Sequence, residues 1–181
     1  AFNTNDMGEM GFQGVVITDD VWMRNVATYC EDNLERILKV RDADLGLLEK
    51  SVELLSLRHQ VLKSAFTVLK STGAIKQVIL NNRKPAFDIV SLDKPFSEKA
   101  LNKAIDENTK KSLDLQKDSL FKVTIIDFND ARFMVMHAHH IILDGWCLPV
   151  IINDLQRYYG ELINGTSIEA LTEEINKEVS S

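Results

Sequence analysis

The feature that most constrains the fold is the succession of a strand pattern, a polar turn and a helix pattern in residues 131–163. Residues 131–138 alternate between two sets of side chains, which is the period of a β-strand. Asp144 and Gly145 follow, and glycine tolerates turn conformations that other residues resist. Pro149 suits the first turn of a helix. The chain therefore predicts a buried strand that ends in a rigid turn and continues into a helix.

Three of the four histidines lie at the end of this strand pattern. If the alternation continues, His137 and His139 point to one face and His140 to the other. His140 is then the catalytic candidate that faces substrate, while His139 is less accessible and supports it. His137 is interpreted as a buried core residue with a hydrogen-bonded ring. A metal site formed by His137, His139 and Asp144 stays an alternative, although no cysteine pair or second histidine cluster completes it.

Residues 139–145 read His-His-Ile-Ile-Leu-Asp-Gly. This run matches H-H-x-x-x-D-G and resembles the signature of the condensation domains of nonribosomal peptide synthetases, which are built like chloramphenicol acetyltransferase. The resemblance implies that the catalytic set comprises His140, His139, Asp144 and Gly145. Gly145 is the candidate backbone donor to an oxyanion.

A second run, residues 57–66, is similar to the condensation-domain pattern R-H-x-x-L-R-T-x-F, with lysine and serine in place of the second arginine and the threonine. The resemblance implies a contact between Arg58 and Asp144. A buried carboxylate is costly unless it is paired, so this contact is expected to support the turn that carries His140. Breaking such a pair is expected to cost about 3–5 kcal/mol.

Periodicity and turn signals along the rest of the chain predict an α/β fold: a mixed sheet with flanking helices, one lobe of a chloramphenicol acetyltransferase-like fold. The predicted strands are residues 33–40, 61–69, 75–80, one that begins at Phe121, and 131–138; the predicted helices are residues 43–57, one capped by Ser97, and one from about Pro149 to Gly165. Asn129 and Asp130 predict a hairpin turn. Residues 33–165 are assigned to the lobe, residues 1–32 to an N-terminal segment without an assigned role, and residues 166–181 to a charged tail or linker.

The resemblance also implies a reaction and its partners. A condensation domain joins an acyl donor to an amine acceptor, each tethered to a carrier protein by a phosphopantetheine arm, and it needs no cofactor or metal of its own. Such domains have two lobes, and this chain resembles the N-terminal lobe only. We therefore expect a fragment, an excised lobe or half of a two-chain enzyme that is inactive alone and self-associates through its open face. A non-catalytic module that docks carriers or other domains, and an acyltransferase with an alcohol acceptor, remain alternatives.

Residues 10–20 raise a separate possibility. They are similar to the G-F-x-G-V-V-x-[ST]-D-D strand of family 3 glycoside hydrolases, in which Asp19 would be the nucleophile. That family's site needs a complete barrel, which the following sequence does not predict. A strand that ends in an aspartate-containing turn is the preferred interpretation.

Composition excludes several other classes. A net charge of −6 argues against a nucleic-acid or anionic-membrane partner. The apolar runs are too short to span a bilayer, and the start of the chain lacks a signal-peptide pattern. Cys30 and Cys147 provide no disulfide framework, which favours a cytoplasmic location. Serine hydrolase elbows, phosphate-binding loops and dinucleotide-binding glycine patterns are absent from the sequence.

Overall fold

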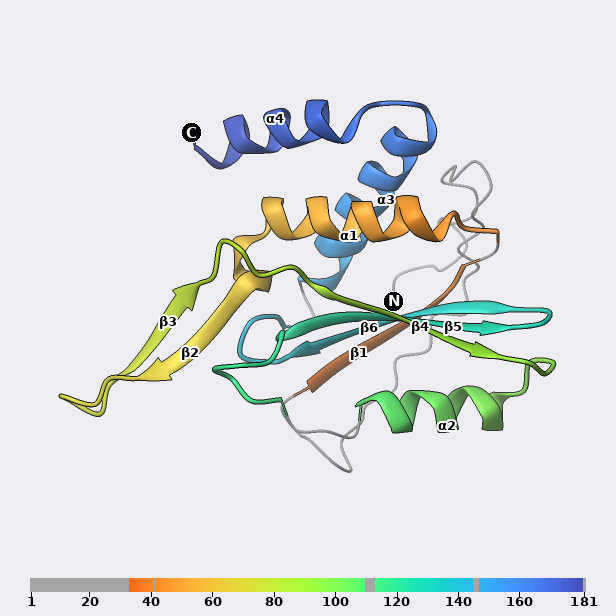
Figure 1. The fold of residues 1–181 in the computed structure, drawn as a ribbon, viewed down its shortest axis with the longest axis horizontal. Helices are drawn as coiled ribbons and strands as arrows, with labels where there is room; N and C mark the ends of the chain where they lie inside the picture. The colour runs from red at the N-terminus through yellow and green to blue at the C-terminus, as the bar shows by residue number, and fades with distance from the viewer. Residues whose placement is uncertain (1–32, 41, 110–112, 145–146, 181) are drawn as a thin grey trace, which may run out of the picture.

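A computed structural model describes residues 33–40, 42–109, 113–144 and 147–180. A four-stranded sheet of order β1-β6-β5-β4 carries helices on both faces, and a two-stranded sheet, β2-β3, extends to one side (Figure 1). The elements are β1 (Asn33–Lys39), α1 (Leu45–Arg58), η2 (Gln60–Lys63), β2 (Ser64–Val68), β3 (Ile75–Ile79), β4 (Ala86–Leu92), α2 (Glu98–Thr109), β5 (Phe121–Phe128), β6 (Arg132–His139), α3 (Leu148–Ile163) and α4 (Ile168–Val179). The predicted α/β fold with a mixed sheet and flanking helices is confirmed.

The four-stranded sheet is mixed because one of its three pairings is parallel. Strand β6 lies at the centre and pairs antiparallel with both β1 and β5, whereas β4 pairs parallel with β5. The backbone N–H of Phe128 donates to the carbonyl of Ala131 at 2.7 Å and closes the β5–β6 turn, as the Asn129–Asp130 signal predicts. The histidine strand is therefore held from both sides.

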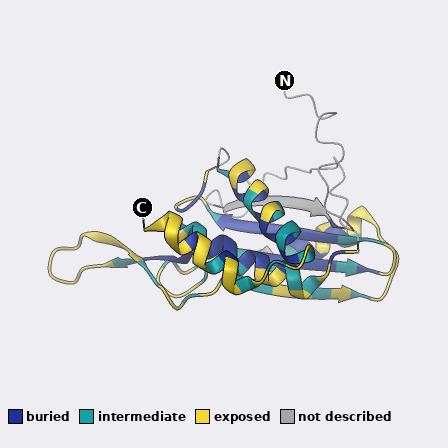
Figure 2. Cartoon of the chain, turned by 90° about the horizontal axis from the view of Figure 1, so that it is seen from above, coloured by how far each residue is buried: buried dark blue, intermediate teal, exposed yellow. Residues whose placement is uncertain are grey.

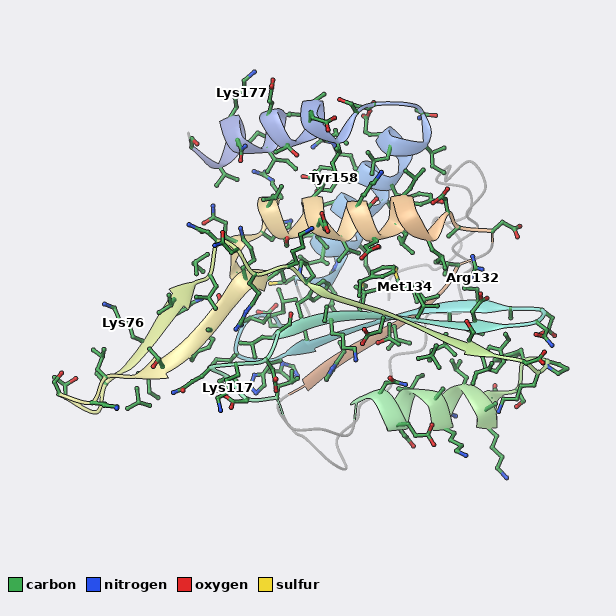
Figure 3. All side chains as sticks on the ribbon, in the orientation of Figure 1. Lys76, Lys117, Arg132, Met134, Tyr158 and Lys177 are labelled. Carbon is green, nitrogen blue, oxygen red and sulfur yellow. The ribbon has the colours of Figure 1, made fainter. Side chains whose placement is uncertain are left out.

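The two faces of the sheet have separate apolar cores. Helices α1 and α3 cover one face, and α2 covers the other (Figure 1). Alternation along β6 sends Met134 and Met136 to the first core, and Phe133 and Val135 to the second. The central strands are the most deeply buried part of the chain, and Figure 3 shows Met134 on the side of the sheet that faces α1 (Figures 2 and 3).

Local sequence signals explain where the helices begin and end. Asp44 caps α1, because its side chain accepts a hydrogen bond from the Leu47 N–H at 2.9 Å. Ser97 caps α2 through the Ala100 N–H at 3.2 Å, as predicted. Gly165 follows α3 with a φ of +90°, a conformation that favours glycine.

The strand predicted over residues 61–69 is only partly correct. Residues 60–63 form the short 3₁₀-helix η2, because the Leu62 N–H bonds to the carbonyl of His59 at 3.0 Å, and β2 begins at Ser64. The β2–β3 hairpin then projects away from the cores (Figures 1 and 2). Val68 and Ile75 on it are 53% and 74% exposed.

Residues 166–181 are assigned from the sequence to a charged tail or linker, and the structure shows that residues 168–179 of this segment form a helix. Ser167 caps a helix there by accepting from the Ala170 N–H at 3.2 Å. Leu171 and Ile175 of this helix, α4, bury themselves against residues of α1 and α3, and Figure 3 shows Tyr158 in this third core. The four-residue spacing of these two apolar side chains is the signal that the many charged neighbours obscure.

Strand β4 is the other element that the sequence prediction lacks. Its side chains mix half-buried and exposed positions, because β4 lies at an edge of the sheet. In such a strand the alternation of apolar and polar side chains is weak, so the sequence gives little sign of it. None of the helices in the described ranges is long and apolar enough to cross a membrane.

Candidate functional site

The candidate site is built on the end of β6. Strand pairing with β5 ends at Ala138, which lies opposite Phe121. The next backbone N–H, that of His139, donates at 2.9 Å to the carbonyl of Leu120, a loop residue just before β5. On the other side His139 lies opposite Asn33 of β1. The first histidine of the pair is therefore fixed by backbone contacts on both flanks.

The turn after His139 also orients its ring. The carbonyl of His139 accepts a hydrogen bond from the Ile142 N–H at 3.1 Å. The Ile141 N–H donates at 3.0 Å to Nδ1 of the His139 ring. Because Nδ1 accepts here, a neutral ring carries its proton on Nε2. The backbone of the turn thus sets both the orientation and the tautomer of His139.

His140 is the first residue of the turn and differs from its neighbour in accessibility. Its side chain is exposed, whereas that of His139 is half-buried. This order confirms the prediction that His139 is the less accessible of the two. The arrangement leaves an imidazole in contact with solvent at the end of a rigid strand, where it could reach a bound substrate.

His137 is buried, as predicted, but its ring is not fully hydrogen-bonded. The residue is 3% exposed, and its Nε2 has no hydrogen-bond partner within the described part of the chain. Burial, followed by the charges of Lys122 and His139, lowers the pKa of His137 to about 4. Lys122 is in turn paired with Asp88 at 2.7 Å. The expectation of a satisfied core histidine is therefore wrong at this nitrogen.

We expect His137 to make the protein sensitive to acid. Between about pH 6.5 and pH 4 the unfolded chain binds a proton that the folded state rejects, so the free energy of unfolding falls as the pH falls through this window. The pKa difference corresponds to about 3 kcal/mol when it is fully expressed. Urea unfolding at pH 7 and pH 4.5 should show that His137→Gln removes most of this loss. The matched control is His140→Gln, which replaces an exposed ring and should keep the wild-type slope.

Asp144 lies on the surface and organises the start of α3. Its Oδ1 accepts a hydrogen bond from the Cys147 N–H at 3.0 Å, and its carbonyl accepts from the same N–H at 3.2 Å. The Ile151 N–H then bonds to the carbonyl of Cys147, which begins the helix. Gly145, the predicted oxyanion donor, lies outside the described residues, as does Asp19.

The predicted contact between Arg58 and Asp144 is wrong. Nη1 of Arg58 lies 3.1 Å from Oε2 of Glu178 on α4, and Asp144 is exposed rather than a buried carboxylate. Arg58 is the last residue of α1, and α1 packs against α4, the helix that the sequence prediction replaces with a tail. The cost of about 3–5 kcal/mol expected for a broken buried pair therefore does not apply to this exposed pair.

An unpredicted hydrogen bond joins His59, next to Arg58, to helix α3. Nε2 of His59 lies 2.6 Å from Oδ2 of Asp154, and both side chains are about three-quarters buried. Asp154 has no sequence signal of its own, because a lone acidic residue on a helix is usually solvated. Residues 58 and 59 thus tie the end of α1 to both C-terminal helices, rather than to the histidine turn.

The described residues contain no group of three or more histidine, cysteine, aspartate or glutamate side chains that could hold a metal ion. The alternative metal site at His137, His139 and Asp144 finds no support in this part of the chain. What the arrangement offers instead is acid–base chemistry at an exposed imidazole.

Residues 33–177 match the family model described as condensation domain. Among curated proteins, the chain is 35% identical over 133 residues to tyrocidine synthase 3 of Brevibacillus parabrevis, which is 70% of this chain and 2% of that protein. It is 29% identical over 125 residues to bacitracin synthase 1 of Bacillus licheniformis, which is 67% of this chain and 2% of that protein.

Solved structures show the same fold at lower identity. The epimerization domain from the third module of tyrocidine synthetase B matches 76% of this chain and 32% of its own, with a TM-score of 0.67 and 21% identity. The first condensation domain of the calcium-dependent antibiotic synthetase matches 75% of this chain and 35% of its own, with a TM-score of 0.64 and 16% identity. The chain thus spans about a third of the length of these solved chains.

Proposed function

The chain belongs to the condensation-domain family, and on that basis we propose that residues 33–177 are the N-terminal lobe of a domain that forms amide bonds between carrier-bound substrates. The substrates are an acyl or peptidyl thioester as donor and an aminoacyl group as acceptor, each on the phosphopantetheine arm of a carrier protein. The lobe needs no cofactor or metal ion for this reaction, because the arms come with the carriers.

The observation that carries the proposal is the contrast between the two motif histidines. His139 is held by the Leu120 carbonyl and by the Ile141 N–H, while His140 beside it is exposed. A catalytic side chain needs this combination of a rigid support and an open face. We assign His140 as the group that contacts the reacting amine, and His139 as its positioning residue.

The proposed chemistry balances without an external reagent. The neutral amine nitrogen attacks the thioester carbon, the C–N bond forms, and the C–S bond breaks as the thiol of the donor arm leaves. The nitrogen loses one proton, and the leaving sulfur gains one. His140 either transfers this proton or orients the amine by a hydrogen bond. Asp144 shapes the turn into α3, and the backbone N–H of Gly145 is the candidate donor to the tetrahedral oxyanion.

The experiment supplies a donor carrier loaded with an acyl group and an acceptor carrier loaded with an aminoacyl group. These are incubated with residues 1–181 and a separately made C-terminal lobe of a condensation domain. We expect mass spectrometry to detect an amide on the acceptor carrier. A parallel reaction with a hydroxyacyl acceptor should give no ester.

Each alternative predicts a different result in the same assay. An ester in the second reaction would favour an acyltransferase with an alcohol acceptor. Binding of loaded carriers without product would favour a docking module. Inversion of the aminoacyl centre without amide would favour epimerization, the activity named for one of the matched structures. Any of these outcomes would overturn the proposed amide formation.

A further inference from the structure

The support of the histidine turn continues into a loop that belongs to neither sequence motif. The β5–β6 ladder ends at Ala138, so the backbone N–H of His139 relies on the carbonyl of Leu120 at 2.9 Å. Leu120 precedes β5 and is fully buried. Its position is set by the loop of residues 114–119, which leads into it.

That loop forms a turn that is held by hydrogen bonds between its own polar groups. The side chain of Asp114 accepts hydrogen bonds from the N–H groups of Gln116 and Lys117, at 2.9 and 3.3 Å. The Asp118 N–H donates to the Asp114 carbonyl at 2.9 Å. Figure 3 places Lys117 on this loop. The turn leaves several carbonyls on one side, and backbone carbonyls need donors.

Arg83 supplies those donors. Its guanidinium donates to the carbonyls of Asp118, Lys117 and Gln116, at 2.8, 3.1 and 3.3 Å. It also donates at 3.0 Å to the carbonyl of Ser64, the buried first residue of β2. No acidic side chain of the described ranges forms an ion pair with it. One side chain thus joins the start of β2 to three successive carbonyls of the loop.

We propose that Arg83 is a positioning residue for the histidine turn. It fixes the loop, the loop fixes Leu120, and the Leu120 carbonyl fixes the backbone of His139 and thereby the direction of His140. A side-chain link between the run at residues 57–66 and the histidine motif then passes from Ser64 through Arg83 to Leu120, in addition to the backbone hydrogen bond from the Phe66 N–H to the Leu115 carbonyl at 2.8 Å. That this link affects catalysis rests on the proposed function, whereas the effect of Arg83 on the His139 backbone can be tested without any turnover.

The guanidinium is the chemical group that this position requires. Four carbonyls from two segments surround it, and a planar fork with five N–H donors can bond to all of them at once. A lysine ammonium has three donors on a single atom and cannot span the same set. We therefore expect Arg83→Lys to fail in the same way as Arg83→Gln, although it keeps the charge.

The test measures amide hydrogen exchange by NMR in residues 1–181. Arg83→Gln and Arg83→Lys should each raise the exchange rate of the His139 amide by about tenfold or more, because charge-assisted hydrogen bonds to the loop are lost. The ¹⁵N shifts of the His139 ring, which report its Nδ1 hydrogen bond, should change as well. The matched control is Lys84→Gln, which removes a charge from the next residue and breaks only a surface pair with Glu53.

The outcomes separate this inference from the proposed function. Unchanged exchange and ring shifts of His139 in both Arg83 variants would overturn the positioning role, even if the loop itself loosened. A uniform rise of exchange along the whole chain in both variants would also overturn it, because it would indicate a general loss of stability. In the two-lobe assay, Arg83→Lys should lower kcat about tenfold with little change in KM. Absence of amide product in every reaction would reject the proposed function, but the exchange result would still decide the link.

Discussion

Residues 1–181 alone are expected to form no amide from loaded carriers, although they contain the complete H-H-x-x-x-D-G motif. Holding two reactants at attack distance can supply about 7–11 kcal/mol of barrier lowering, and a single lobe encloses neither tethered arm. The chain covers only about a third of the length of the solved domains it matches. Product formation, followed by mass spectrometry, should appear only after a C-terminal lobe is added.

The control for this result is the C-terminal lobe without residues 1–181, which lacks the histidine motif and should also give no product. Multiple turnovers by residues 1–181 alone would contradict the geometric argument. Such a result would mean that one lobe suffices to bring the two arms together.

Replacing His140 by alanine in the two-lobe protein is expected to lower kcat by about 10²–10⁴-fold, the usual range for the loss of a positioned acid–base group. The melting temperature should hardly change, because the side chain is exposed and substitutions at such positions usually alter stability by less than about 0.5 kcal/mol. Single-turnover kinetics with preloaded carriers would separate this chemical step from carrier binding.

A matched comparison uses His59→Ala, which removes another imidazole of the chain. That ring is paired with Asp154, so its loss should reduce stability and leave the chemical step of the folded protein unchanged. If His140→Ala retained kcat within about threefold, His140 would not be the group that contacts the amine. The catalytic assignment would then have to pass to another side chain near the turn.

The sequence was informative where side-chain periodicity is clean. The alternation along residues 131–138 predicts β6, the faces of its side chains and the different accessibility of His139 and His140. The sequence pattern does not predict the helix at residues 168–179 or the strand at residues 86–92, for opposite reasons. In the first segment charged residues mask two buried apolar positions, and in the second an edge strand lacks a fully buried face.

The polar contacts were much less predictable, because they depend on which distant elements meet. Arg58 finds Glu178 only because α4 exists and packs on α1. Arg83 leaves no motif at all, since its partners are backbone carbonyls, which any sequence provides. His137 Nε2 likewise lacks a hydrogen-bond partner among the described residues because of its depth in the sheet, which periodicity predicts, and because of its neighbours, which periodicity does not predict.

Helix α4 bears on how modular proteins could exchange this lobe. A recombination point directly after Gly165, where the predicted lobe ends, would leave behind the helix that covers Leu54 and Tyr158. The recipient would inherit an uncovered apolar surface, and Arg58 would lose Glu178. The segment that must be transferred as a unit therefore extends at least to Val179. Hybrid proteins joined upstream of α4 would have a folding defect that is unrelated to their catalytic residues.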